Sequence, residues 1–341
     1  MSAVVWTLQS YADVHAALRS DCLAPYGVQR RGDGTHEVVR RGVALEMPPA
    51  LLNVWRVALS ARADALLLTL PTDATVDLVT DFAVPWARDA AQLALALSPD
   101  IVDDCMPMAR TIAGEAAIAR SGAPSDVLAQ AAARLSAQLG AFGGASLVQS
   151  FVALTHTVPA LIASALLALL QHPEQLAWLR AQLAESMLAN ATNELLRYAG
   201  PSRAVFRTAV APVSLGDVAI NTGDEVVLLL AQANRDPTRF VDPDQFDLQR
   251  NATGHLAFGS GPHGCAGATI VRMLLHEAIA AFVRAPRVFT LDHPASGVTW
   301  LDGFSLRAPR TLPAVVRERS VSSNASQAVS GENAVDRSEG E

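Results

Sequence analysis

The chain has 341 residues, half of them apolar, and can therefore bury a large core. Its formal net charge of -7 argues against nucleic acid as a partner, because phosphate binding requires a basic face. Its three cysteines, Cys22, Cys105 and Cys265, are widely spaced and form no CxxC pair, which argues against a disulfide framework and a zinc site and favours a reducing compartment.

The first residues of the sequence and its longest apolar run both argue against a signal peptide or a membrane span. The first residues, Met1 to Leu8, contain no basic residue and are followed directly by polar ones, which is not the pattern of a signal peptide. The longest apolar run, Val158 to Leu170, is interrupted by Pro159 and Ser164 and is too short to cross a bilayer. We therefore expect a soluble, cytoplasmic protein with no membrane contact and a buried helix at this run.

Helical periodicity predominates along the chain. Alanine and leucine recur at helical spacing in seven segments, which are 11–18, 51–70, 86–97, 125–139, 146–170, 173–198 and 268–282. Strand patterns occur at 203–210, 213–220 and 225–230, with turn residues between them. The pattern predicts a mainly α fold with a small β portion. We expect residues 1–318 to form a single domain and the polar residues 319–341 to be a disordered tail.

Cys265 lies in an unusually glycine-rich segment. Gly259, Gly261, Gly264 and Gly267 surround it, and the helix predicted from Ala268 onward would direct its N-terminal partial positive charge toward the sulfur. A haem thiolate requires a tight turn of this kind, which approaches a flat macrocycle and keeps the sulfur deprotonated. On the residues alone, a glycine-rich turn with an incidental buried cysteine remains the alternative.

The segment Phe258-Gly259-x-Gly261-x-His263-x-Cys265-x-Gly267 resembles the haem loop of the cytochrome P450 family. The resemblance implies that the cofactor is haem b and that Cys265 is the ligand of its iron. It also implies that Phe258 packs near the sulfur, that His263 contacts a haem propionate, and that the glycines bind alongside the cofactor. For His263, a solvated loop histidine is the alternative.

A further set of residues fits the same resemblance. By itself, the pair Glu194 and Arg197 on one helix face is an ordinary ion pair. In the family, a glutamate and two arginines form a buried structural clamp on the haem loop, which here corresponds to Glu194, Arg197 and Arg250. Gln245 departs from the arginine often found at its position, and we expect looser local pairing there.

Haem propionates are anionic and require arginine or histidine donors. The resemblance assigns this role to Arg207, to His255 and to Arg56 on an early helix. Leu52 stands where the family commonly has a histidine, so the predicted set of contacts is reduced. A solvated helix arginine is the alternative for Arg56.

The segment 153–173 resembles the long central helix of the family, which carries an acid and a threonine that relay protons. Here Thr157 keeps the threonine, His156 replaces the acid, and Leu154 replaces a glycine. An imidazole can donate and accept protons near neutral pH, so His156 is either a substitute for the acid or a core histidine. Leu154 adds bulk, and Pro159 removes a backbone donor and predicts a nearby kink.

The resemblance also indicates a shortened member of the family. The chain begins at what resembles the strand and helix of the first sheet, Val4 to Leu18, and only about 70 residues separate Phe82 from Ala153. We therefore expect truncation at the N-terminus and in the roof over the distal pocket.

The resemblance implies an enzyme, a cytochrome P450-type oxidoreductase. Its expected activity is that of a haem-thiolate monooxygenase, which inserts one oxygen atom from O2 into a small organic substrate of the secondary-metabolite kind. Electrons would come from a separate ferredoxin or flavodoxin, because no flavin or iron-sulfur domain is apparent in the sequence. His156 favours an alternative, a peroxide-dependent or non-redox haem enzyme such as a peroxygenase, dehydratase or isomerase. The shortened roof favours another, a catalytically impaired haem-binding protein.

Overall fold

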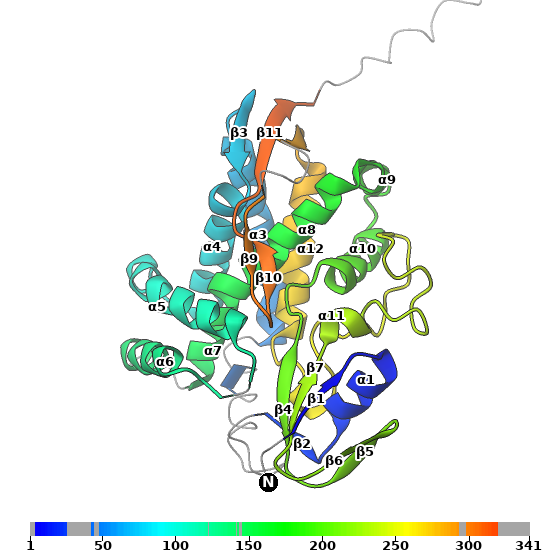
Figure 1. The fold of residues 1–341 in the computed structure, drawn as a ribbon. Coiled ribbons are helices and arrows are strands. Elements are labelled where there is room, and N and C mark those ends of the chain that lie inside the picture. Colours follow the sequence, from blue (N-terminus) through cyan, green and yellow to red (C-terminus); the bar gives the residue numbers. More distant parts are fainter. Residues whose placement is uncertain are drawn as a thin grey trace, which may run out of the picture.

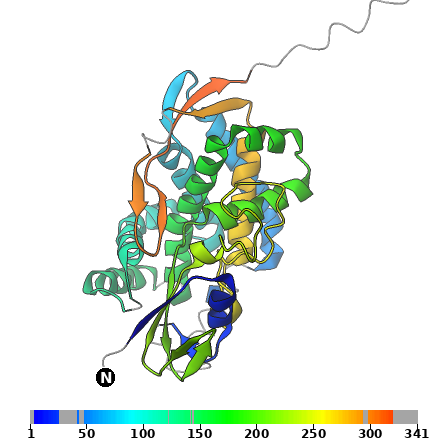
Figure 2. The same cartoon turned by 45° about the vertical axis from the view of Figure 1, so that its right-hand side comes forward.

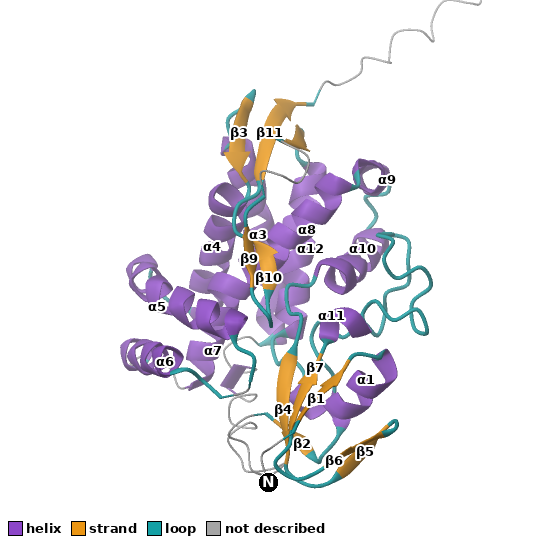
Figure 3. Ribbon diagram, viewed as in Figure 1, coloured by secondary structure: helices purple, strands orange, loops and turns teal. Residues whose placement is uncertain are grey.

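The computed structural model describes residues 4–25, 42–43, 48–121, 123–140, 142, 145–292 and 298–319. Helices form the bulk of the molecule, and small sheets lie at its two ends (Figure 1; Figure 3). The helices are α1 (Tyr11–Arg19), α3 (Pro49–Thr69), α4 (Val84–Leu95), α5 (Pro99–Ile118), α6 (Asp126–Leu139), α7 (Ala145–Val152), α8 (Val158–Gln171), α9 (Pro173–Ala181), α10 (Glu185–Ala199), α11 (Leu230–Ala233) and α12 (Ala268–Arg284).

The core lies where α4, α10 and α12 pack around α8, and α3 packs on α12 and α4. Almost every residue of α8 is buried, which explains why its sequence is apolar on all sides rather than on one face. Together with α7, it forms the continuous helical run Ser146–Gln171, which is long and apolar enough to cross a membrane. Because 67% of its most apolar window is buried inside the protein, this run is the central core helix, as we expected for the shorter run 158–170.

Two sheets and two hairpins frame the helices, and Figure 2 shows the same arrangement from a second side. Among the described residues, one sheet has the order β1-β7-β4-β2, in which β1 (Val5–Leu8) is parallel to β7 (Glu225–Leu228). The strand β4 (Val205–Ala209) is antiparallel to both β7 and β2 (Leu23–Ala24). This sheet places Arg207 of β4 in the interior.

The second sheet, at the opposite end, has the order β3-β11-β8. It joins residues far apart in sequence, because β3 (Ala74–Asp77) pairs with β11 (Pro313–Glu318), which also pairs with β8 (Arg287–Leu291). The hairpins are β5 (Val213–Leu215) with β6 (Val218–Ile220), and β9 (Trp300–Asp302) with β10 (Arg307–Pro309).

The structure confirms the mainly α class and each predicted helix, with one correction. The single helix expected over 173–198 is two helices, because the chain turns at residues 182–184 and Glu185 begins α10. Leu183 in this turn is 45% exposed, so a continued helix would gain little burial there. The helix α5 was not predicted, although Ser98 and Pro99 form a common helix start. Apart from Arg319, the predicted tail 319–341 lies outside the described residues.

The described part of the chain contains two π-helical turns, Val79–Ala83 and Ala153–Thr157, and each is followed by Val-Pro. Pro159 has no N–H to donate to the carbonyl of Thr155, so an α-helical bond cannot form at this point. The backbone N–H of Val158 instead bonds to the carbonyl of Ala153, five residues earlier. The kink predicted from Pro159 therefore takes the form of a widened turn.

Candidate functional site

The cysteine loop is a tight turn closed by backbone hydrogen bonds. The N–H of Cys265 donates to the carbonyl of Phe258 (2.9 Å), and the N–H of Gly264 donates to that of Gly261 (3.1 Å). Gly259 and Gly261 have φ angles of +66° and +71°, which side chains rarely adopt, and a Cβ on Gly261 would lie 2.8 Å from the carbonyl oxygen of Leu18. The turn therefore depends on glycine, and it leaves Cys265 exposed just before Gly267 and α12.

Two polar side chains, those of Arg272 and His255, flank the ring of Phe258 in this loop. The guanidinium carbon of Arg272, on α12, lies 5.2 Å from the centre of the Phe258 ring, and the ring of His255 lies 5.8 Å from it. Burial lowers the pKa of Arg272. His263 ends the short 3-10 turn Gly261–His263. The loop thus has an arginine stacked beside its aromatic residue, a contact that the sequence did not indicate.

The predicted clamp is present. Both oxygens of Glu194 accept from Arg197, at 2.7 and 2.8 Å, and both side chains are fully buried. The Nε of Arg250 approaches Oε1 of Glu194 at 3.3 Å, and the N–H of Asp247 donates to the same oxygen at 3.2 Å. The structure therefore brings together the three residues that the sequence analysis grouped. A buried bidentate pair of this kind keeps its geometry, because its alternative is an uncompensated buried charge.

Backbone carbonyls complete the clamp. Arg197 donates to the carbonyls of Asn234 (2.9 Å) and Pro243 (2.8 Å), and both arginines donate to that of Gln245 (3.4 and 3.2 Å). The side chain of Gln245 is not needed for this pairing, so the substitution there does not loosen it.

Two asparagines that the sequence analysis did not identify tie the clamp to its surroundings. Asn190 donates to the carbonyls of Leu248 (2.8 Å) and Arg250 (3.1 Å). Asn234 accepts from the N–H of Leu256 (2.6 Å), two residues before Phe258. The second contact makes a direct connection from the clamp to the cysteine loop. The sequence analysis gave neither residue a role, and only the folded chain reveals their contacts.

Arg207 and His255 are buried donors, and each has a nitrogen that finds no acceptor among the described residues. The guanidinium of Arg207 donates only to the carbonyl of Phe206 (2.8 Å), and within the described residues no carboxylate pairs with it. Burial lowers its pKa to about 10. Burial, followed by Arg272 and Arg197, lowers the pKa of His255 to about 4. The Nδ1 of His255 accepts from the N–H of Ala257 (3.2 Å), so Nε2 carries the proton and finds no acceptor in the described part of the chain.

Arg56 lies in a different cluster from these two donors. Its guanidinium contacts Glu185 and Glu277, each at 2.5 Å, and His276 contacts Glu277 at 2.9 Å. These contacts join α3 to α10 and α12. The propionate role predicted for Arg56 would require it to leave two carboxylates, so in this structure Arg56 is a structural ion-pair residue.

The π-helical turn Ala153–Thr157 carries the predicted proton-relay residues. The hydroxyl of Thr155 donates to the carbonyl of Phe151 (2.7 Å) and lies 2.9 Å from Nδ1 of His156. Because that hydroxyl has a single proton, His156 must donate from Nδ1, which leaves Nε2 as an acceptor. Burial, followed by Arg110, lowers the pKa of His156 to about 4, so the ring is neutral near pH 7.

The remaining residues of this turn differ in burial. Leu154 is 1% exposed and belongs to the core. Thr157 is partly exposed at the end of the turn. Thr155, which the sequence analysis did not select, is the residue that orients His156.

These residues fit a haem. An exposed thiol, a loop kept open by glycine and two buried donors without acceptors are what a flat dianionic macrocycle with a central metal requires. The carboxylates of the cofactor would satisfy Arg207 and His255.

Comparisons with known proteins agree with this geometry. The family model described as Cytochrome P450 matches residues 145–305. Cytochrome P450 monooxygenase PikC of Streptomyces venezuelae is 42% identical over 154 residues, which are 45% of this chain and 36% of PikC. Cytochrome P450 CYP199A2 of Rhodopseudomonas palustris is 29% identical over 287 residues, 76% of this chain and 69% of that protein. The matched segment thus spans about a third of PikC.

The same similarity extends to solved structures. The ligand-free crystal structure of CYP164A2 from Mycobacterium smegmatis superposes with a TM-score of 0.79 at 23% identity and covers 91% of this chain and 90% of that one. At this identity the likeness concerns the fold. It confirms the predicted fold class over most of the chain.

Proposed function

We propose that this chain, a cytochrome P450 of the bacterial type by its sequence and its fold, is a haem-thiolate monooxygenase acting on a small organic substrate. Proteins of this family bind haem b, and that cofactor agrees with the donors described above. The observation that carries the proposal is the exposed Cys265 in a glycine turn fixed by a buried clamp, together with two buried donor groups, Arg207 Nε and His255 Nε2, that find no acceptor in the described part of the chain.

Each residue of the proximal side has a distinct task. Cys265 would bind the iron, and Arg207 and His255 would bind the carboxylates of the cofactor. The N-terminus of α12, which begins three residues after Cys265, favours the thiolate form of Cys265. When bound, the haem supplies the binding and reductive activation of O2. Glu194, Arg197 and Arg250 act indirectly, because they fix the loop through Asn234.

On the distal side, His156 stands where the family has an acid, and its chemistry differs from that of a carboxylic acid. His156 is neutral near pH 7 and offers a lone pair at Nε2, while its Nδ1 proton stays bonded to Thr155. It can therefore accept a hydrogen bond from a water molecule and orient that water, but it does not store a proton. Thr157 is the second hydroxyl within this turn and the candidate donor at its exposed end.

The cofactor part of the proposal is tested by spectroscopy. Purified protein, reduced and exposed to carbon monoxide, should show the red-shifted Soret band that is typical of thiolate-ligated haem. Cys265→Ser should lose this band, whereas Cys22→Ser, a matched control outside the loop, should keep it. A Soret band unaffected by Cys265→Ser would overturn the assignment.

The monooxygenase part is tested by turnover. With NADPH, a ferredoxin or flavodoxin and its reductase, a substrate library should reveal substrate-dependent NADPH use and a product that carries one atom from labelled O2. The library should begin with 6-deoxyerythronolide B and 20-oxo-5-O-mycaminosyltylactone, because two relatives of this chain are named as the enzymes that oxidise these compounds. NADPH use without any oxygenated product in such a library would count against the proposal.

A second candidate is a peroxide-dependent haem enzyme. The neutral His156 and the buried Leu154 favour it, because a peroxide already carries the protons and electrons that the relay and the redox partner would otherwise deliver. Product formation with hydrogen peroxide, but not with O2 and a reductase system, would select this candidate. Failure with both oxidants, together with intact haem binding, would point to the haem-binding protein without oxidase activity or to the non-redox enzymes.

The cell compartment and the domain organisation also belong to this proposal. We expect a cytoplasmic protein that receives electrons from a soluble donor, since the one long apolar helix in the described residues is mostly buried. We expect residues 1–318 to behave as one domain, which limited proteolysis of the holo-protein would test.

A further inference from the structure

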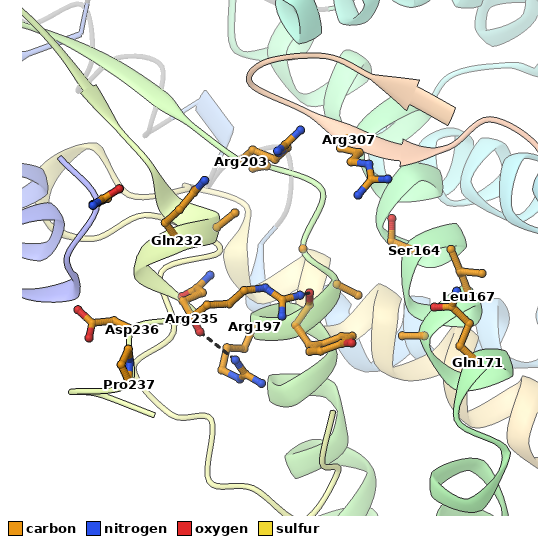
Figure 4. Close-up of a pocket in the computed structure, with 18 of the residues that line it drawn as sticks. Ser164, Leu167, Gln171, Arg197, Arg203, Gln232, Arg235, Asp236, Pro237 and Arg307 are labelled. Atoms are coloured by element: carbon orange, nitrogen blue, oxygen red, sulfur yellow. Dashed lines mark hydrogen bonds between the residues drawn. The ribbon is translucent and has the colours of Figure 1, made fainter. Parts of the chain in front are cut away.

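One pocket of the described structure is not lined by the residues proposed to bind the haem. It has a volume of about 740 Å³ and lies between α8, the end of α10, α11 with the loop that follows it, and the hairpin β9–β10 (Figure 4). Cys265, Arg207, His255 and Thr157 do not line it. A volume of this size suits a small organic molecule. We call it the arginine pocket, after Arg203, Arg235 and Arg307 in its wall.

The positive charge of the arginine pocket is only partly neutralised. Arg203 and Arg307 share one oxygen of Asp302, at 3.2 and 3.4 Å, and the Asp302 side chain is 59% exposed. Arg235 contacts Asp244 at 2.9 Å, and the Asp244 side chain is 84% exposed. Neither aspartate lines the pocket. Exposed pairs of this kind are weak, so three guanidinium groups retain N–H donors for a ligand.

Asp236 is the carboxylate that does line the pocket, and its charge is engaged elsewhere. It accepts from the N–H of Tyr11 (2.6 Å) and from the N–H and hydroxyl of Thr238 (2.8 and 2.7 Å). These hydrogen bonds fix Asp236 and lower its pKa. Besides Arg197 of the clamp, the lining itself therefore has three arginines and one engaged carboxylate, while the two aspartates that pair with these arginines lie outside it and are exposed.

Aromatic rings hold two of the arginines in place. Arg307 lies 4.0 Å from the ring centre of Trp300, and Arg235 lies 4.6 Å from that of Tyr198. Stacking fixes the plane of a guanidinium and leaves its edge available for two parallel hydrogen bonds to a carboxylate or phosphate. Figure 4 shows Arg307 and Arg235 entering the pocket from opposite walls. Separate cationic groups on facing walls suit a ligand with more than one anionic group.

Apolar and neutral polar side chains line the rest of the arginine pocket. Leu167, Ser164 and Gln171 of α8 form one side, as Figure 4 shows, and Gln232 lies across from them. The combination of guanidinium groups, amides and short apolar side chains matches a carbon skeleton with anionic ends. We propose that the arginine pocket binds a small organic molecule with two or more carboxylate or phosphate groups, at a site separate from the haem.

The arginine pocket and the cysteine loop are connected through shared residues. Asn234 lines the arginine pocket and also accepts from the N–H of Leu256, and Arg197 of the clamp lines it as well. A ligand that stiffens this wall therefore contacts the same residues that fix the loop. The proposal itself does not require the haem function, because it rests on the charges and the shape of a different pocket.

Calorimetric titration of the holo-protein with citrate and with inorganic pyrophosphate tests the proposal, with acetate as the single-charge comparison. Citrate or pyrophosphate should bind at least about tenfold more tightly than acetate. Arg307→Gln and Arg235→Gln should each weaken binding about tenfold. The matched control Arg310→Gln, an exposed arginine outside the pocket, should bind as the unmodified protein does. A preference for citrate would identify carboxylates as the ligand class, and a preference for pyrophosphate would identify phosphates.

Arg307→Lys keeps the charge but loses the paired donors, and it guards against a folding defect in the glutamine variants. Its melting temperature should be unchanged, and its binding should fall between that of the unmodified protein and Arg307→Gln. Absence of binding by both polyanions would overturn the proposal, as would equal weakening in Arg310→Gln. Binding of a hexaglutamate peptide without binding of either small anion would also overturn it, in favour of an acidic polypeptide.

Discussion

Replacing Arg207 with methionine should have opposite effects on the protein with and without its cofactor. Arg207 is 8% exposed, donates only to one carbonyl, and has a pKa lowered to about 10 by burial. Since one pKa unit corresponds to about 1.4 kcal/mol, keeping this charge buried costs roughly 3 kcal/mol when no anion is present. Methionine has similar bulk and no charge. Arg207→Met should therefore stabilise the haem-free protein by about 1–3 kcal/mol.

The same change should weaken retention of the haem. A charge-assisted hydrogen bond to a buried carboxylate contributes about 1.5–3 kcal/mol, which corresponds to about 10- to 100-fold faster loss of haem. Urea denaturation of the haem-free protein measures the first effect, and transfer of haem to excess apomyoglobin measures the second. The matched control is Arg203→Met, because Arg203 precedes the same strand, is 39% exposed and pairs with Asp302. It should change both quantities little.

Two results would refute this reasoning. Destabilisation of the haem-free protein by Arg207→Met would mean that Arg207 is a packing residue rather than an uncompensated charge. An unchanged rate of haem loss would mean that Arg207 does not contact the cofactor.

Three further predictions concern the clamp and the distal turn. Glu194→Gln leaves the buried Arg197 without its charge partner and should lower the free energy of unfolding, measured by urea titration, by about 3–5 kcal/mol. The control Glu185→Gln changes a side chain that is 64% exposed and should lower it by less than about 1 kcal/mol. The pKa of His156 in the folded state, about 4, lies below its unfolded value, so its contribution to stability is complete above pH ~6.5 and is lost as the pH falls toward 4. Thermal melts across this range should show a smaller loss for His156→Gln than for the unmodified protein, and identical losses would contradict the burial of the ring. Thr155→Val removes the acceptor of the hydrogen bond from Nδ1 of His156 and should lower the free energy of unfolding by about 1–3 kcal/mol. An unchanged free energy of unfolding would mean that another group accepts this hydrogen bond.

The sequence was sufficient for features that repeat at short range. The glycine spacing around Cys265 predicted a tight turn, and the spacing of Glu194 and Arg197 placed them on one helix face, where they meet. The periodicity of 146–170 predicted the core helix. In each case the interacting groups are close in the chain, so that local geometry determines the contact.

Contacts between distant segments were outside the reach of this reasoning. Asn234 meets Leu256 only because the chain turns back after α11, and sequence spacing does not predict this contact. The ion pairs of Arg56 with Glu185 and Glu277 could not be foreseen either, because they depend on the packing of α3 against α12. The strands β3 and β11 are joined across most of the chain, and each is too short for its pattern to stand out.

The widened turns before Pro85 and Pro159 have a consequence for changes in chain length. A single deletion within α8 would rotate every later side chain of this helix by about 100°, so that none would meet its present neighbours. The turn Ala153–Thr157 already holds one residue more than a regular helix would need. Removing one residue there, together with Pro159→Ala, would leave both flanking helices facing their present neighbours. Such a shortened protein should fold normally while losing the arrangement of His156 and Thr157, so that folding and distal chemistry could be varied independently.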